Sequence, residues 1–417
     1  MSIVNFKKII IIGGVVILLI ILVVVVSQSL KKQSISTLTP VPGETVTPGG
    51  ALPSAGPGGT VTSTQTGGQL PEGTGQAPIT TEPTQTTVTE QTAVATRENK
   101  IKDLIEYTSS APTLSGDGSS VQYYDKADNK FYKINGDGEV VEMTSDKFFN
   151  VDQVIWSPSK DRAIITYPDQ SKIIYDFTTK KQITLPKHWE EFNFSPNGSQ
   201  VAFKSMGYDT ENSWLAVMNN DGTMAKTVEK IGNNADNIMV SWSPNNQMIG
   251  MELQGNNFDQ KKIYFIGLNG ENFKSITTQG RGFMPLWSPS GNQLLYSVYS
   301  SDNNYLPDLW VTDSQGGELG ANLHPLNLNT WANKCIFNGE NEAYCAVPQN
   351  LESGAGMIPA SAKNATDNLY LVDLTSGQKI LIDGSNQYNI TNLILTQDKQ
   401  FIYFTDSITG RLFKLAI

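Results

Sequence analysis

The chain of 417 residues has little of the chemistry that catalytic and metal sites usually require. It contains only two cysteines and two histidines, too few for a cluster of His and Cys ligands or for several redox centres. Arginine occurs at only four positions, so forked contacts to carboxylates and phosphates are scarce. The net charge of −10 and the pI of about 4.9 argue against nucleic acid as a partner, because nucleic-acid binding requires a basic surface. We therefore predict no metal, no cofactor and no nucleic-acid partner.

Sequence motifs of common enzymes are also missing. There is no G-x-S-x-G elbow, H-E-x-x-H pair, phosphate-binding loop or dinucleotide-binding glycine pattern. His188 and His324 are far apart in the chain, so the sequence suggests no Ser/His/Asp triad. Asp209, Asp259 and Asp302 lie in polar segments that could hold calcium, but they lack the spacing of an EF-hand, and a solvated loop is the alternative. We predict that the protein is not an enzyme.

The chain begins with an apolar run. Ile9 to Val26 is 18 residues without a charge, flanked by lysines on both sides. At about 1.5 Å per residue it spans roughly 27 Å, close to the thickness of a hydrocarbon core. We predict an uncleaved transmembrane signal anchor over residues 1–32, with a cytoplasmic N-terminus. The alternative is a secreted or periplasmic protein whose signal peptide is cleaved after Ser27 or Ser29, although no Ala-x-Ala site is present.

Residues 33–97 differ sharply from the run before them. They are rich in Thr, Pro, Gly, Ser and Gln, with few large apolar residues, so burial cannot offset the entropy lost on ordering. We predict a disordered linker, which as a flexible coil would span roughly 45 Å root-mean-square. Residues 1–32 carry +4 and residues 33–97 carry −3, which leaves −11 for residues 98–417.

A short phrase of an aromatic residue, Ser and Pro recurs in the rest of the chain. The clear copies begin at Trp156, Phe194, Trp242 and Trp287. Weaker copies begin at Leu114, Ile336 and Leu395, which makes seven. The spacing of 38 to about 59 residues is typical of propeller blades.

Each phrase is followed by segments that alternate between apolar and polar residues. A polar turn and a short apolar run come first, and in most repeats a second hairpin follows, as in residues 261–277 and 368–382. This pattern predicts four strands per repeat and an all-β, seven-bladed β-propeller over residues 98–417. The last repeat stops after its third strand at residues 411–417, so residues 100–107 are expected to supply the fourth and close the ring.

The repeat W-S-P-x-G followed by an apolar run and a hairpin resembles the propeller repeat of TolB. Similar repeats occur in the propellers of the prolyl oligopeptidase and dipeptidyl peptidase families. The resemblance covers residues 98–417 and implies the fold, but not the role of TolB, which has an additional N-terminal domain. We expect a membrane-anchored, extracytoplasmic scaffold that binds an envelope protein, peptide or glycan. The alternative is an envelope hydrolase or lyase that uses the mouth of the propeller channel.

Two groups of residues have a predicted structural role. The repeat aromatics Trp156, Phe194, Trp242 and Trp287 are expected to pack between neighbouring blades. Cys335 and Cys345 fall on either side of a hairpin in the sixth repeat, so their side chains can face each other across two strands. A disulfide is expected if their Cα atoms lie within about 4.4–6.8 Å, and two free buried thiols are the alternative. An oxidising location outside the cytoplasm would permit the bond.

A candidate binding rim comes from the segments that precede each innermost strand, since all of them should emerge on one face around the channel. These segments contain Phe149, Trp189, Phe283, Trp331 and Tyr388, with Tyr107 and Ile238 at the two remaining positions. Large aromatics on the rim of an acidic domain would suit a peptide, glycan or protein ligand. The alternative is that they cover the blades as ordinary packing.

Overall fold

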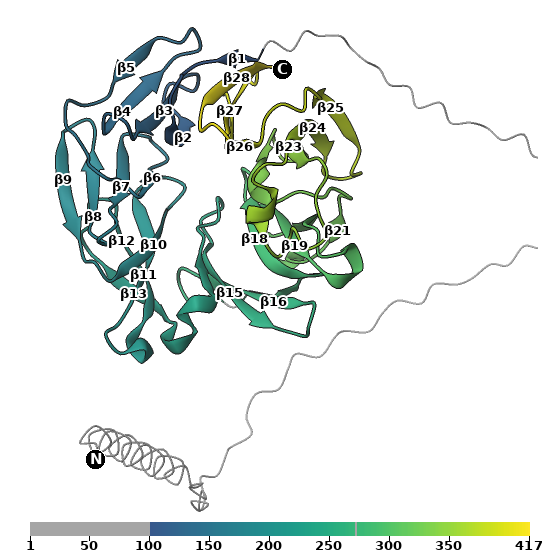
Figure 1. Ribbon diagram of the computed structural model, residues 1–417. Coiled ribbons are helices and arrows are strands. Elements are labelled where there is room, and N and C mark those ends of the chain that lie inside the picture. The colour runs from purple at the N-terminus through teal and green to yellow at the C-terminus, as the bar shows by residue number, and fades with distance from the viewer. Residues whose placement is uncertain (1–100, 272) are drawn as a thin grey trace, which may run out of the picture. The chain divides into compact units, whose positions relative to one another are not determined.

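The described part of the protein is a closed ring of antiparallel sheets. The computed structural model describes residues 101–271 and 273–417, which form seven four-stranded sheets that follow one another around the ring (Figure 1). The predicted all-β, seven-bladed propeller is therefore confirmed. The predicted anchor and linker lie outside these residues. Within the described ranges no helix combines the length and hydropathy that a membrane crossing needs.

The blades follow the sequence repeats. Blades 1 to 3 contain β2 (Ser109–Leu114), β3 (Val121–Asp125), β4 (Lys130–Ile134) and β5 (Val140–Glu142), then β6 (Gln153–Trp156), β7 (Arg162–Thr166), β8 (Lys172–Asp176) and β9 (Lys181–Leu185), then β10 (Trp189–Phe194), β11 (Gln200–Ser205), β12 (Trp214–Asn219) and β13 (Lys226–Lys230). Blades 4 and 5 contain β14 (Ile238–Val240), β15 (Met248–Gly255), β16 (Lys261–Gly267) and β17 (Ile276–Thr277), then β18 (Arg281–Trp287), β19 (Gln293–Tyr299), β20 (Asp308–Asp313) and β21 (His324–Pro325). Blades 6 and 7 contain β22 (Cys335–Phe337), β23 (Glu342–Pro348), β24 (Asp367–Asp373) and β25 (Lys379–Asp383), then β26 (Ile390–Leu395), β27 (Phe401–Asp406), β28 (Leu412–Ala416) and β1 (Lys102–Asp103).

Short 3-10 helices occupy some of the connections. They are η1 (Thr210–Asn212), η2 (Gly232–Asn237), η3 (Ser301–Asn303), η4 (Gly316–Glu318), η5 (Ala332–Lys334) and η6 (Pro359–Ala362).

Strand order gives the ring two different faces. In blades 1 to 6 the strands pair in sequence order, and in blade 7 β1 takes the fourth position after β28. The first strands of neighbouring blades contact one another around the axis, as β2 contacts β6 and β26. Antiparallel order places the connections between second and third strands on the same face as the connections between blades. We call this the loop face. The turns from first to second and from third to fourth strand lie opposite, on the turn face.

The two ends of the domain close the ring. β1 pairs with β28, with Lys102 opposite Lys414 and Asp103 opposite Phe413. Beyond the strand, the Leu104 amide donates to the Leu412 carbonyl at 3.0 Å. Arg411 also forms an ion pair with Asp103. The predicted borrowing of an N-terminal strand is confirmed.

Buried apolar side chains gather between the blades. Seven clusters each join two neighbouring blades, one for every interface of the ring. Trp156 shows the pattern: its ring lies 5.4 Å from that of Phe131 in blade 1 and 5.3 Å from that of Phe177 in blade 2. Its indole N–H donates to the Ala111 carbonyl of blade 1 at 2.8 Å. The predicted packing of the repeat aromatics between blades is confirmed.

The serine of the repeat stabilises the turn that follows it. Ser243 is fully buried, and its Oγ accepts from the backbone N–H of Met248 at 2.9 Å. The same bond, to the residue five positions later, is made by Ser195 to Gln200 at 2.9 Å and by Ser288 to Gln293 at 3.1 Å. A short hydroxyl side chain is required here because it must reach a backbone donor in its own turn.

The same turns contain a left-handed residue in every blade. These residues are Gly118, Lys160, Gly198, Asn246, Gly291, Gly339 and Lys399. At Gly291 the neighbouring blade adds a second constraint. Its φ is +73°, and a Cβ there would lie 2.8 Å from the backbone nitrogen of Asn245 in the turn of blade 4.

We predict that Gly291→Ala destabilises the domain more than Gly270→Ala. Gly270 has a similar φ of +76°, but a Cβ there would meet no atom within 4 Å, so its substitution measures backbone strain alone. The clash at Gly291 should lower the free energy of unfolding by about 1–2 kcal/mol beyond that strain. Thermal unfolding followed by circular dichroism measures the difference, and equal losses would show that neighbouring turns do not constrain each other.

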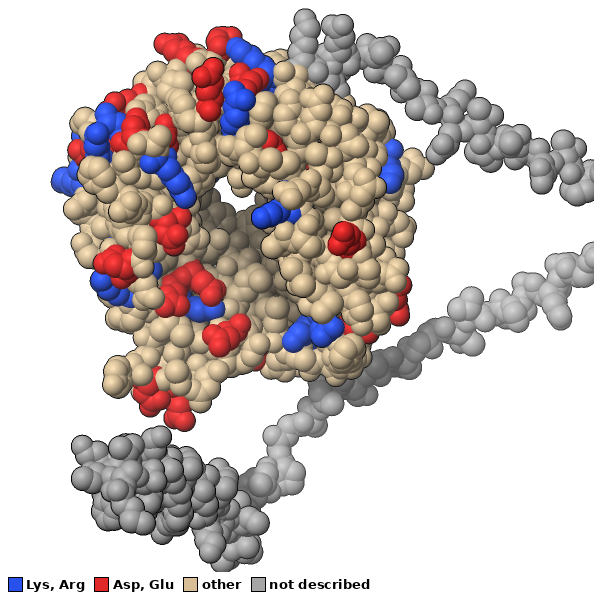
Figure 2. Space-filling model, in the orientation of Figure 1, with Lys and Arg blue, Asp and Glu red and all other residues tan. Residues whose placement is uncertain are grey.

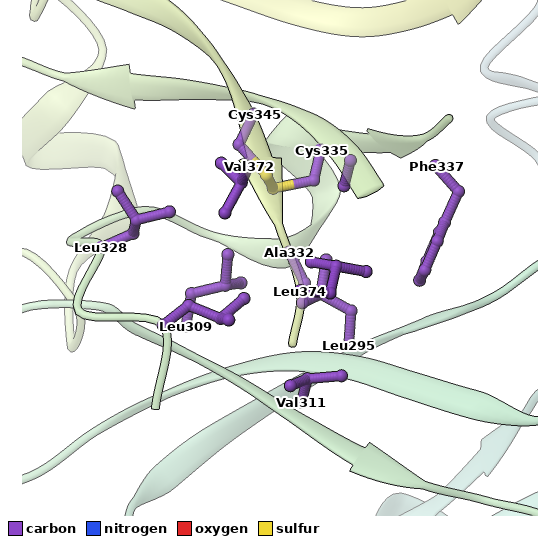
Figure 3. Close-up of a cluster of buried hydrophobic side chains, with 12 residues drawn as sticks. Leu295, Leu309, Val311, Leu328, Ala332, Cys335, Phe337, Cys345, Val372 and Leu374 are labelled. Carbon is purple, nitrogen blue, oxygen red and sulfur yellow. A yellow bond between two sulfur atoms is a disulfide. The ribbon is translucent and has the colours of Figure 1, made fainter. Parts of the chain in front are cut away.

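Cys335 and Cys345 form a disulfide across the first two strands of blade 6. They lie directly opposite each other on β22 and β23, with a Cα–Cα distance of 4.1 Å, just below the usual range for a disulfide. The bond sits in the cluster between blades 5 and 6, near Leu309 and Val372 (Figure 3). The predicted pairing is confirmed, and within the described residues neither thiol is free.

We predict that reduction of this disulfide lowers the free energy of unfolding by about 2–3 kcal/mol, the value expected for so short a loop. Urea unfolding with and without reductant measures the effect. The double variant Cys335→Ala/Cys345→Ala is the control, because reductant should no longer change its midpoint. An equal change in the variant would assign the effect of reductant to something other than this bond.

Candidate functional site

Most of the predicted binding rim is packed into the blades. Phe283 is 5% exposed and Trp331 is 7% exposed. The ring of Trp189 lies 4.2 Å from that of Phe203, and Tyr388 packs 4.6 Å from Phe413. Phe283 and Trp331 are therefore buried and Trp189 and Tyr388 are half-buried, and binding of a ligand by these four residues stays a prediction.

Phe149 differs from the other four. Its side chain is 63% exposed and, together with Tyr167 and Pro168, lines an open depression of about 430 Å³ on the loop face. Of the two remaining positions, Tyr107 is 42% exposed and Ile238 is buried. The seven positions therefore do not form one continuous exposed surface, and binding at Phe149 stays a prediction.

Exposed apolar side chains are nevertheless concentrated on the loop face. Among the described residues thirteen large apolar side chains are exposed. Seven lie in connections of the loop face, namely Tyr107, Phe149, Tyr208, Phe258, Met357, Ile358 and Ile408. Five lie on outermost strands, and only Met224 lies on the turn face. Because isolated apolar residues are normal on any surface, it is this uneven distribution that marks the loop face.

The sequence-based prediction missed the connections between second and third strands. Tyr208, Phe258, Met357 and Ile358 all lie in such connections, which strand order alone would have placed on this face. The signal was a large apolar residue inside a polar segment, as Phe258 in the segment NNFDQ.

Three of these connections are joined into one surface across blades 4, 5 and 6. The Ser301 hydroxyl donates to Asp259 Oδ2 at 2.6 Å, which joins the connections of blades 4 and 5. The amides of Gly354 and Gly356 donate to the carbonyls of Asn304 and Tyr305 at 2.9 and 2.8 Å, which joins blades 5 and 6. Residues 349–366 also cover Trp331, through Ala355 and Ala362. These contacts restrict the surface to one arrangement.

A buried ion pair holds the end of the 349–366 connection. Lys334 Nζ lies 2.9 Å from Asp367 Oδ2 and donates to Asn389 Oδ1 at 3.0 Å. The Asn389 amide in turn donates to the carbonyls of Ala362 and Lys363. Burial lowers the pKa of Lys334 and raises the pKa of Asp367, and the attraction between the two opposes both shifts. Breaking such a pair leaves an uncompensated buried charge, so the pair fixes the connection against blade 7.

Charged groups of both signs surround the central opening of the ring (Figure 2). Over residues 101–271 and 273–417, no three His, Cys, Asp or Glu side chains are grouped to hold a metal ion. His188 lies before β10 and His324 lies in β21, so the histidines belong to different blades. Asp259, one of the loop carboxylates considered for calcium, accepts through Oδ2 from the Ser301 hydroxyl.

Comparison of the chain with protein-family models and with curated proteins finds no match. Solved structures do match. An oligogalacturonate lyase in complex with manganese is 13% identical, with a TM-score of 0.51, covering 78% of this chain and 94% of that chain. An oligogalacturonate lyase from Vibrio parahaemolyticus is 10% identical, with a TM-score of 0.47 and coverages of 78% and 95%. A β-propeller domain from Myceliophteria thermophila is 11% identical, with a TM-score of 0.48 and coverages of 76% and 100%. At such identities the similarity concerns the fold alone.

We predict that Phe283→Ala and Trp331→Ala each lower the free energy of unfolding by about 3–5 kcal/mol, because each leaves a cavity in a buried cluster. Phe149→Ala, at an exposed position, should change it by less than about 0.5 kcal/mol. Chemical unfolding of the three variants checks this ranking. A large loss for Phe149→Ala would show that its ring belongs to the core.

Proposed function

We propose that the propeller is a binding module that holds a protein or peptide partner on its loop face. The concentration of exposed apolar side chains on this face carries the proposal, since only one of the thirteen lies on the turn face. The linked connections of blades 4 to 6 support it, because a surface that is ordered before binding loses less entropy on association.

We further propose that this module is displayed outside the cytoplasm, in the cell envelope. The apolar run Ile9–Val26 would anchor it, residues 33–97 would hold it away from the membrane, and the TolB-like repeat is in keeping with such a setting. The Cys335–Cys345 disulfide supports an oxidising compartment. Secretion after removal of the leader is the alternative to anchoring.

A lyase or hydrolase acting at the channel mouth is the second candidate. The fold similarity to the manganese-bound oligogalacturonate lyase is the observation that supports this second candidate. Among the described residues, no three His, Cys, Asp or Glu side chains are placed to hold a metal ion together. These residues therefore do not fit a metal site, and we derive no metal-dependent step.

Capture from solubilised envelope tests the binding function, with the full chain in detergent as bait. We predict a partner that the unaltered chain retains and that Phe258→Ser/Met357→Ser/Ile358→Ser loses, because the variant removes apolar contact area from the loop face. The matched control is Val141→Ser/Ile380→Ser/Leu381→Ser, which removes three exposed apolar side chains from outermost strands. Partner loss with the control alone would place binding on the outer edge. The second candidate is favoured if no bait retains a partner and if incubation of the protein with oligogalacturonate produces the ultraviolet absorbance of an unsaturated product.

A further inference from the structure

Arg281 lies close to two aromatic rings on the loop face. It is the first residue of β18, where the innermost strand of blade 5 begins. Its guanidinium carbon lies 4.6 Å from the centre of the Phe258 ring, which belongs to blade 4, and 5.6 Å from that of Tyr299. Both distances are within the range of cation–π attraction, so the rings hold the guanidinium in place by its faces.

The hydrogen-bond donors of this guanidinium are unused. Its Nε lies 4.0 Å from Asp259 Oδ1, an ion-pair distance that is too long for a hydrogen bond, and both atoms are buried without a hydrogen-bond partner among the described residues. The side chain is 27% exposed although Nε is buried, so the rest of the side chain reaches solvent. The other two arginines of the described ranges are paired, Arg162 with Asp176 at 2.9 Å and Arg411 with Asp103. Arg281 is thus the described arginine whose ion pair includes no hydrogen bond, which leaves its terminal nitrogens for a ligand.

Close packing fixes the Tyr299 side of this arrangement. A Cβ at Gly282 would lie 2.3 Å from the Tyr299 ring, and a Cβ at Gly356 would lie 2.6 Å from the Tyr299 Cβ. Glycine at both positions lets the backbone of β18 and the 349–366 connection approach the tyrosine. Arg281 therefore rests on a ring that cannot move without displacing two backbone segments.

Apolar side chains border the cation. Gly356 packs against Tyr299, and the next two residues of the chain, Met357 and Ile358, are 49% and 62% exposed. Phe258, whose ring lies against the guanidinium, is 71% exposed. The surface thus combines one forked cation with flexible aliphatic and aromatic groups.

We propose that Arg281 anchors a carboxylate-binding site, and that its ligand is a peptide segment in which the carboxylate adjoins an apolar side chain, as at the C-terminus of a protein. This inference rests on the binding function proposed above. The guanidinium fork matches a carboxylate in two parallel hydrogen bonds. Met357 and Ile358 provide the adaptable aliphatic contact that suits a peptide side chain. The charge of −11 over residues 98–417 opposes a polyanionic chain and leaves a single carboxylate as the favoured anion.

Fluorescein-labelled hexapeptides ending in Leu, Phe or Val test the site. Each is prepared with a free C-terminal carboxylate and as the carboxamide, and binding to the full chain in detergent is measured by anisotropy. We expect the carboxylate forms to bind at least about tenfold more tightly, the value of one charge-assisted pair, and Arg281→Gln to remove that difference. Arg162→Gln is the matched control, since Arg162 is 28% exposed and lies on the turn face.

A second variant tests the same site in case Arg281→Gln does not fold. Met357→Asp/Ile358→Asp places negative charge beside the site at exposed positions, so it should weaken the carboxylate forms while the melting temperature is unchanged. The inference is overturned if carboxylate and carboxamide bind equally, or if Arg162→Gln weakens binding as much as Arg281→Gln does. Binding of oligogalacturonate that depends on Arg281, without binding of peptides, would also overturn it. A captured partner that depends on Phe258, Met357 and Ile358 but not on Arg281 would leave the proposed function standing and remove this site.

Discussion

Closure of the ring is the constraint on which the rest of the structure depends. A propeller has no single core, because each blade buries its apolar face only against the next blade, and here seven clusters occupy the seven interfaces. At the interface between blades 7 and 1, β1 joins β28, and the contact of Ser109 with Gly410 spans 301 residues. The entropy cost of closing so long a segment rises only slowly with its length, so two short strands and one cluster suffice.

The ring separates the residues that determine the fold from those available for function. On the turn face the repeated serine must accept a backbone donor, and the following turn must adopt a left-handed residue against the neighbouring blade, as at Gly291. On the loop face the connections carry no such requirement. They vary in length up to residues 349–366, and their tips expose apolar side chains such as Phe258 and Ile358. Binding residues are commonly found on such connections, because the rigid scaffold positions them.

In this domain the aromatic residues beside the innermost strands contribute to the fold, whereas Arg281 is the residue proposed to bind a ligand. Residues next to the innermost strands lie where two blades meet, so Phe283 and Trp331 contribute to buried clusters. Arginine is rare, and at two of its three described positions a carboxylate pairs with it closely. At Arg281 the Asp259 carboxylate is 4.0 Å away, and two aromatic rings also stabilise the cation. A cation supported by rings keeps its hydrogen-bond donors for another molecule.

The sequence by itself determined the fold, the blade count, the strand that closes the ring and the cysteine pair. These follow from local patterns, since alternation, turn residues and a repeat length act within one blade, and Cys335 and Cys345 are only ten residues apart. Only the tertiary structure decided which aromatics are buried. Trp331 and Phe149 occupy equivalent places in the repeat, but residues 349–366 cover only Trp331. It likewise brought Phe258, Arg281 and Tyr299 together, because they come from two blades, one from the connection after β15 and two from the ends of β18 and β19. Contacts between distant segments depend on how the blades pack, and no pattern within a single repeat records them.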